Sequence, residues 1–96
     1  MSEEALYQQK RQAELDEWNA DLAKFKAKAS GASADAQLEM HKQIKMLEDK
    51  MQESKAKLEE LAKAGESGLE SLKGSLESAW ESTKTTFADA AAYFKH

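Results

Sequence analysis

The chain has 96 residues, with no proline, no cysteine, no valine and a single isoleucine, so it is too short for several domains and poor in residues that favour β-strands. Its 18 acidic and 14 basic residues give a net charge of −4, and Arg11 is the only arginine. Nucleic-acid binding usually needs a basic face, so this balance argues against a nucleic-acid partner, and the lack of cysteine excludes disulfides and thiolate chemistry.

The N-terminus carries no targeting signal that we can identify. Met1-Ser2-Glu3-Glu4 is acidic and lacks the apolar run of a signal peptide. No stretch approaches the roughly 20 apolar residues that a membrane-spanning helix requires. We therefore expect a soluble, cytoplasmic protein.

An eleven-residue repeat is the strongest pattern in the chain. Eleven residues make three α-helical turns at about 3.67 residues per turn, so residues at this spacing share one helix face. The repeat predicts long amphipathic helices and, with the composition, an all-α fold. Apolar residues recur at this spacing, weakly at first and then strongly: Phe25, Ala36, Leu47, Leu58, Leu69 and Trp80.

The first helix is predicted over residues 3–29. Ser2 can cap it, and Glu3 and Glu4 lie in its first turn, where the helix dipole favours negative charge. Gly31 can adopt the left-handed conformation that ends a helix, and Ser33 is a suitable N-cap for the next one. The apolar face of this helix consists of Tyr7, Leu15, Trp18, Leu22, Phe25 and Ala29.

The second helix is predicted over residues 34–64, with Ser54 as the weak point of its apolar seam. Gly65 supplies a stop, and Ser67 with Glu70 forms a capping-box pattern for the third helix. Alternatively, the repeat continues through Gly65 and the two helices fuse into one rod. Two glycines in four residues cost a helix about 2 kcal/mol relative to alanine, which favours the break. The seam consists of Met40, Ile44, Leu47, Met51, Leu58 and Leu61.

The third helix is predicted over residues 68–95. Serines and glycines lower its intrinsic helix propensity, so we expect residues 67–95 to open before residues 34–64. Its outer side carries Ser67, Ser71, Ser75, Ser78 and Ser82. Its apolar side carries Leu69, Leu72, Leu76, Trp80, Phe87, Ala91 and Phe94.

Three helices of matched length joined by tight turns predict a single domain over residues 1–96. The expected architecture is an antiparallel hairpin plus a third amphipathic helix, which together form an up-down-up three-helix bundle or coiled coil. The first helix is polar at Gln8, Gln9 and Arg11, and Ser54 adds to the thin packing expected at that end. A thin seam invites a second chain, so we expect a weak homodimer, with the monomeric bundle as the alternative.

No catalytic, cofactor-binding or metal site is predicted. His41 and His96 are the only imidazoles, and neither has a second ligand at helical spacing. The carboxylates alternate with lysines on exposed faces, where pairs such as Glu53 with Lys57 explain them as helix-stabilising charges. We therefore expect a protein that is not an enzyme and needs no cofactor and no metal.

The apolar face of the third helix is the candidate interaction surface. Aromatic stripes at helical spacing usually fill a core, and the alternative is contact with a protein partner or a lipid interface. Residues 66–95 carry five acids and three lysines, so anionic lipid headgroups would repel them and lipid is the less favoured partner. The candidate residues are Leu69, Leu72, Leu76, Trp80, Phe87 and Phe94.

Several segments resemble a family of short bacterial coiled-coil domain-containing proteins. They are Ala32-Ser-Ala-Asp-Ala36, Leu58-Glu-Glu-Leu61, Leu76-Glu-Ser-Ala-Trp80-Glu-Ser-x-Lys84-x-x-Phe87 and Tyr93-Phe94-Lys95. The eleven-residue repeat is also similar to those of apolipoprotein and late-embryogenesis-abundant helices. The resemblance implies a non-catalytic helical interaction or scaffold protein associated with stress, and it brings no catalytic residues.

Overall fold

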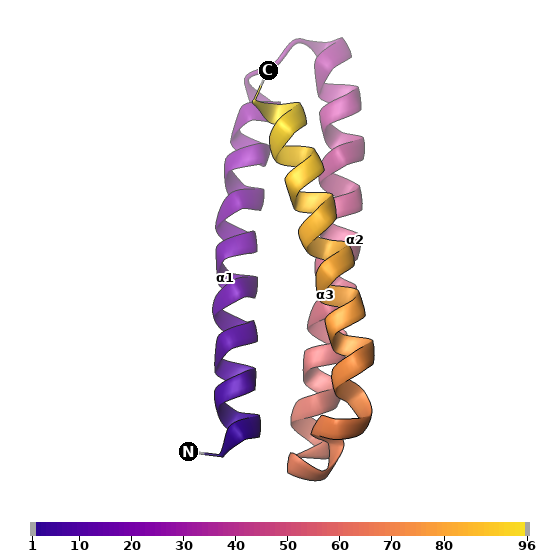
Figure 1. Cartoon of the computed structure of the whole chain (residues 1–96). Helices are drawn as coiled ribbons and strands as arrows, with labels where there is room; N and C mark the ends of the chain where they lie inside the picture. The colour runs from indigo at the N-terminus through magenta and orange to yellow at the C-terminus, as the bar shows by residue number, and fades with distance from the viewer. Residues whose placement is uncertain (1, 96) are drawn as a thin grey trace.

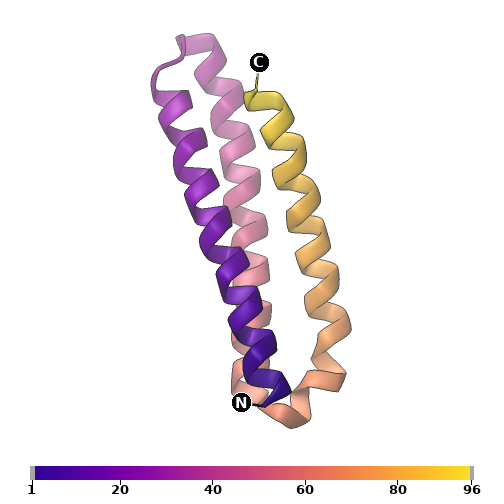
Figure 2. The same ribbon diagram turned by 60° about the vertical axis from the view of Figure 1, so that its left-hand side comes forward.

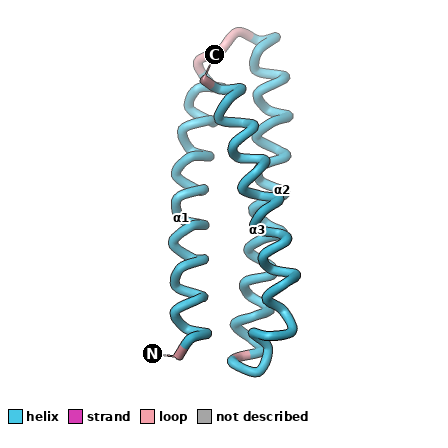
Figure 3. The backbone as a smooth tube through the Cα atoms, in the orientation of Figure 1, coloured by secondary structure: helices cyan, strands magenta, loops and turns pink. Residues whose placement is uncertain are grey.

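The computed structural model describes residues 2–95, which form a three-helix bundle (Figures 1 and 3). Helix α1 spans Glu3–Ser30, α2 spans Ala34–Ala64 and α3 spans Glu66–Phe94. The chain runs up, down and up again, so the end of α3 lies near the α1–α2 turn, and the bundle measures 50 × 20 × 19 Å. The predicted all-α three-helix bundle is confirmed. Within residues 2–95, no helix is both long and apolar enough to cross a membrane.

The α1–α2 turn is short and lacks a left-handed residue. Ser2 caps α1 by accepting the Ala5 N–H at 3.1 Å, and Ser33 caps α2 by accepting the Ala36 N–H at 3.4 Å, as predicted. The prediction of a left-handed Gly31 was wrong, because Gly31 has φ −93° and ψ 0°. The chain reverses instead through Ser33, whose backbone is extended at φ −64° and ψ 160°.

The α2–α3 turn is different, because it depends on a glycine. Gly65 has φ 72°, a value that favours glycine, and its N–H donates to the Leu61 carbonyl at 3.0 Å. The alternative of a single fused helix is therefore wrong. The capping box was also wrong: α3 begins at Glu66, so Ser67 lies inside the first turn and its hydroxyl donates to the Ala64 carbonyl at 3.3 Å.

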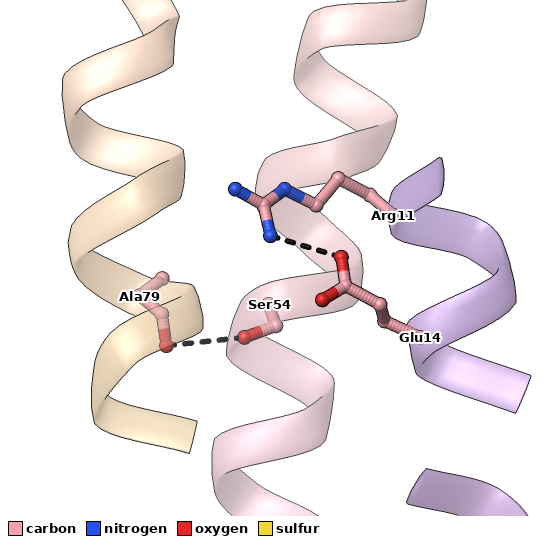
Figure 4. Close-up of polar contacts among 4 residues, drawn as sticks. All are labelled: Arg11, Glu14, Ser54 and Ala79. Carbon is pink, nitrogen blue, oxygen red and sulfur yellow. Dashed lines mark hydrogen bonds and ion pairs between the residues drawn. The ribbon is translucent and has the colours of Figure 1, made fainter. Parts of the chain in front are cut away.

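Helices α2 and α3 are joined by a buried pair of hydroxyl groups. Ser54 Oγ lies 2.7 Å from Thr83 Oγ1. Ser54 Oγ also donates to the Ala79 carbonyl at 3.3 Å (Figure 4). Both Ser54 and Thr83 are completely buried, so Ser54 is a polar contact between helices and not the weak point that its sequence position predicted. Helix α3 also differs from the sequence prediction by one residue. Its buried alanine is Ala90, whereas Ala91, the predicted core residue, is exposed.

The core divides into two clusters along the bundle. Half-buried Trp18 packs against both of them. The upper cluster, near the α1–α2 turn, consists of Leu22, Ala29, Ile44, Leu47, Met51, Phe87, Ala90 and Phe94. The lower cluster consists of Leu15, Leu58, Leu61, Leu76 and Trp80.

Helix α1 contributes least to this core. It buries three residues, whereas α2 buries six and α3 buries eight. Two polar contacts hold its C-terminal end: Lys28 Nζ donates to the Phe94 carbonyl at 2.8 Å, and Lys26 Nζ lies 3.3 Å from Glu48 Oε2. Figure 2 shows α1 passing in front of α2, with α3 to the right of both. The bundle is thus a close α2–α3 hairpin with α1 laid on it.

Candidate interaction surface

The candidate residues predicted from the sequence lie in the core of the closed bundle. The lower four are Leu76 and Trp80, which are buried, and Leu69 and Leu72, which are half-buried. The upper two are Phe87 and Phe94, both buried. In the closed bundle these side chains are therefore covered by α1 and α2. They fill the core, which is the usual role of an aromatic stripe at helical spacing.

Five aromatic rings from α1 and α3 alternate along the bundle, and we call them the aromatic ladder. Trp18 lies between Trp80 and Phe87, with ring centroids 5.4 and 5.5 Å away. Phe25 lies between Phe87 and Phe94, with centroids 6.3 and 4.6 Å away. Such ring pairs add about 0.5–1.5 kcal/mol each beyond their area burial. The ladder is the main apolar contact between α1 and α3.

Arg11 closes the lower end of the ladder. Its guanidinium carbon lies 5.1 Å from the centroid of the Tyr7 ring and 5.3 Å from that of Trp80. One guanidinium nitrogen donates to Glu14 Oε1 at 2.9 Å (Figure 4). Burial disfavours its charge, but Tyr7 and Glu14 outweigh burial and raise the pKa of Arg11 above its ordinary value. A permanent cation therefore covers the Trp80 ring.

Three buried polar atoms around Arg11 have no hydrogen-bond partner among residues 2–95. They are the Tyr7 hydroxyl, the Arg11 Nε and the Trp80 indole nitrogen. An unsatisfied buried polar group costs about 1–3 kcal/mol, so this end of the α1 contact is less favourable than the ladder above it. The cost weakens the hold of the hairpin on the N-terminal half of α1.

Open grooves run along both sides of α1. On the α2 side, a groove of about 420 Å³ lies beside Gln8 and Gln9, where the sequence predicted thin packing, and a second of about 340 Å³ follows it. On the α3 side, a groove of about 450 Å³ has Trp18 and Trp80 in its lining. Its charged lining consists of Glu14, Glu17, Glu77, Glu81, Arg11 and Lys84. These grooves leave α1 incompletely packed on its two flanks.

The structure provides no metal-binding group in the part of the chain that it describes. Residues 2–95 contain no set of three or more histidine, cysteine or acidic side chains placed to hold an ion. His41 is exposed, and His96 lies outside the described residues. Lys57 pairs with Glu60 at 3.8 Å instead of the predicted Glu53.

The large apolar side chains that do reach the surface are dispersed. The most exposed, Leu38, is 67% exposed on α2, and Leu6 is 52% exposed near the opposite end of the bundle on α1. Met46 and Tyr93 are also exposed. Single exposed apolar residues are normal on a protein surface and define no binding patch.

Two features of the contact surfaces were missed from the sequence. The partners of Ser54, in particular Thr83, were missed because Thr83 looked like one of several hydroxyl residues on a weak helix. Arg11 was interpreted only as a polar interruption of the α1 seam. The spacing of Tyr7, Arg11 and Leu15, four residues apart on one helix face, was the available signal that Arg11 faces inward.

Comparison of the chain with protein-family models, with curated proteins and with solved structures gave no match. The resemblance to short bacterial coiled-coil proteins therefore stays a prediction.

Proposed function

We propose that this chain is a non-catalytic helical interaction protein, bacterial and stress-associated, that acts through protein–protein contacts. The observation that carries the proposal is the aromatic ladder. The aromatic side of α3 is covered in part by α1, the helix with the fewest buried residues and with open grooves on both flanks. A partner helix that offers aromatic or aliphatic side chains at helical spacing can replace α1 on the hairpin.

The α2–α3 hairpin supports this role because it has its own contacts. The Ser54–Thr83 hydroxyl pair and the close approach at Ala79 join α2 to α3 without any residue of α1. The hairpin can therefore keep its shape while α1 moves. Opening and closing of α1 then controls whether the apolar face is available.

A lipid interface is the second candidate, and the same ladder favours it. Trp80, Phe87 and Phe94 lie on one face of α3, and such an aromatic face matches the apolar side of an interfacial helix. The acidic lining of the α1–α3 groove disfavours anionic lipids, so the candidate interface is zwitterionic or neutral.

Locking α1 in place tests the proposal. Gln12 and Lys55 line the same two grooves between α1 and α2, so Gln12→Cys with Lys55→Cys, joined by a short bismaleimide, ties α1 to the hairpin. The matched control, Glu53→Cys with Ser78→Cys, joins α2 to α3 across a separate groove and leaves α1 free. The chain contains no natural cysteine, so only the introduced pairs react.

We expect immobilised unlocked and control-linked protein to retain the same partner proteins from a lysate of the native cell, and the α1-locked protein to lose them. Equal retention by the α1-locked protein would contradict the proposal. Flotation with phosphatidylcholine vesicles tests the lipid candidate, which predicts binding by the unlocked protein only. Flotation is preferable to tryptophan emission because Trp80 is only 3% exposed before any ligand binds.

A further inference from the structure

We propose that the α1–α2 turn, residues 31–33, is a hinge through which two copies of this chain exchange α1. In the exchanged dimer, α1 and α2 form one continuous helix, and α1 packs on the α2–α3 hairpin of the second copy. The inference rests on the proposed function, because it requires α1 to leave its own hairpin, and it names a second copy of the chain as the partner.

The apolar seam continues across the turn in helical register. Phe25, Ala29, Ala32, Ala36 and Met40 follow one another at steps of three and four residues, and each is buried or half-buried. Residues at these steps share one face of a continuous helix. The eleven-residue repeat likewise passes from residue 25 through residue 36 into α2. A seam with this register serves a straight helix as well as a hairpin.

No residue of the turn needs a positive φ, and only Ser33 is known to be far from helical, with an extended backbone at ψ 160°. Gly31, at φ −93° and ψ 0°, is in a conformation open to any residue, and a Cβ added there would come no closer than 3.8 Å to the Lys28 carbonyl oxygen. The other turn needs φ 72° at Gly65 and is fixed as a reversal. Straightening of the first turn therefore changes only three residues and leaves the α2–α3 hairpin intact.

The exchanged dimer reuses an interface that the structure shows. Trp18 and Phe25 of one copy take the same places on Trp80, Phe87 and Phe94 of the other, so the ladder is rebuilt between chains. Exchange of an identical element is a low-cost route to a dimer for this reason.

The added contact lies where the two straightened hinges meet. Ala29, Ala32 and Ala36 would face each other there, and their small side chains let two helices approach closely. A continuous helix over residues 3–64 would be about 93 Å long, so the dimer would be far more elongated than the closed bundle.

Two substitutions in the turn shift the equilibrium in opposite directions. Gly31→Ala fits the closed turn but favours a continuous helix by about fivefold per hinge, so the dimer with its two hinges should form about twenty-five-fold more tightly. Ala34→Pro fits the closed bundle, because residue 34 is the first of α2 and Ser33 before it is extended. A proline inside the continuous helix should weaken the dimer more than a hundredfold per hinge. Sedimentation over a wide concentration range measures both effects.

Covalent linking separates exchange from simple side-by-side association. Lys26→Cys with Glu48→Cys replaces an α1–α2 ion pair whose charged atoms lie 3.3 Å apart. In the exchanged dimer a bismaleimide joins this pair between chains, so the purified dimer of the Gly31→Ala background gives a covalent dimer on a denaturing gel. The control pair, Glu53→Cys with Ser78→Cys, stays within one hairpin and gives monomer.

The inference is overturned if the Gly31→Ala protein stays monomeric at high micromolar concentration, if Ala34→Pro dimerises as strongly as the unchanged chain, or if the α1–α2 pair links only within chains. Circular dichroism of both variants checks that the helices are retained. Loss of partners by the α1-locked protein together with a monomeric Gly31→Ala variant would overturn only the second-copy inference. Exchange without any effect of locking on partner retention would overturn only the proposed binding of other proteins.

Discussion

Ser54 and Thr83 hold α2 and α3 together through hydroxyl groups that have no access to water. Thr83 Oγ1 also lies 2.9 Å from the Ala79 carbonyl and 3.1 Å from the Lys50 carbonyl, so the pair bridges the backbones of both helices. Buried polar groups stabilise a fold only when their partners are present, because each orphaned group keeps its desolvation cost. The two residues should therefore act as a unit.

We predict that Thr83→Val destabilises the bundle by about 1–2 kcal/mol, because Ser54 loses its closest partner while the shape of the side chain is preserved. In the Thr83→Val background, Ser54→Ala should lower the free energy of unfolding by less than it does in the unchanged chain. The reason is that it then removes a Ser54 hydroxyl that has already lost its closest partner. Urea unfolding of the single and double variants measures the coupling.

Thr86→Val is the matched control, because Thr86 Oγ1 donates only within its own helix, to the Ser82 carbonyl at 2.9 Å. It should change the free energy of unfolding by less than about 0.5 kcal/mol. Strict additivity of the Thr83 and Ser54 substitutions would show that the hydroxyl pair is not a unit.

Two glycines in α3 should respond oppositely to alanine. Gly74 has no atom within 4 Å of an added Cβ, so Gly74→Ala should stabilise the protein by about 1 kcal/mol through helix propensity. At Gly68 an added Cβ would lie 2.2 Å from the Ala64 Cβ, so Gly68→Ala should destabilise it by about 1–3 kcal/mol. Thermal unfolding compares the two variants, and a gain in stability for both would contradict the close α2–α3 approach at the turn.

At the scale of whole helices, burial and intrinsic propensity point in different directions. Helix α3 has the serines and glycines, yet it buries eight residues and contacts both other helices. Helix α1 has better helix formers but buries only Leu15, Leu22 and Ala29. Most helical stability in proteins comes from packing of the apolar face, so burial should decide which helix opens first.

We therefore predict that amide hydrogens in the N-terminal half of α1, residues 3–14, exchange fastest among the helices. This replaces the expectation from the sequence that residues 67–95 open first. The physical reason is the groove beside Gln8 and Gln9 and the unpaired polar atoms around Arg11. Native-state hydrogen exchange with mass spectrometry measures the order, and faster exchange over residues 67–95 than over residues 3–14 would restore the earlier expectation.

The whole molecule combines one reversal that depends on a positive φ with one that does not. Gly65 fixes the α2–α3 hairpin through a positive φ, while the α1–α2 turn uses backbone conformations open to any residue. Surface ion pairs such as Lys45 with Asp49 lie within one helix and are worth little to the arrangement of the helices. The closed state is therefore defined by the α2–α3 contact, by the packing of α1 on α2 and by the aromatic ladder.

The sequence by itself determined the fold class, the bounds of the three helices to within two residues, and the caps at Ser2 and Ser33. These features depend on residues within a few positions of one another, so composition, periodicity and capping chemistry are sufficient. The tight turns and equal lengths also determined the up-down-up order, since antiparallel neighbours follow from short connections.

Only the tertiary structure decided which side chains meet. It placed Ala90 inside and Ala91 outside, a difference of one residue, because each residue turns the helix face by about 100° and the register is set by the partner helix. It paired Ser54 with Thr83 and stacked Arg11 on Trp80. These contacts join residues far apart in the chain, and their energies depend on distances that no local pattern of residues contains.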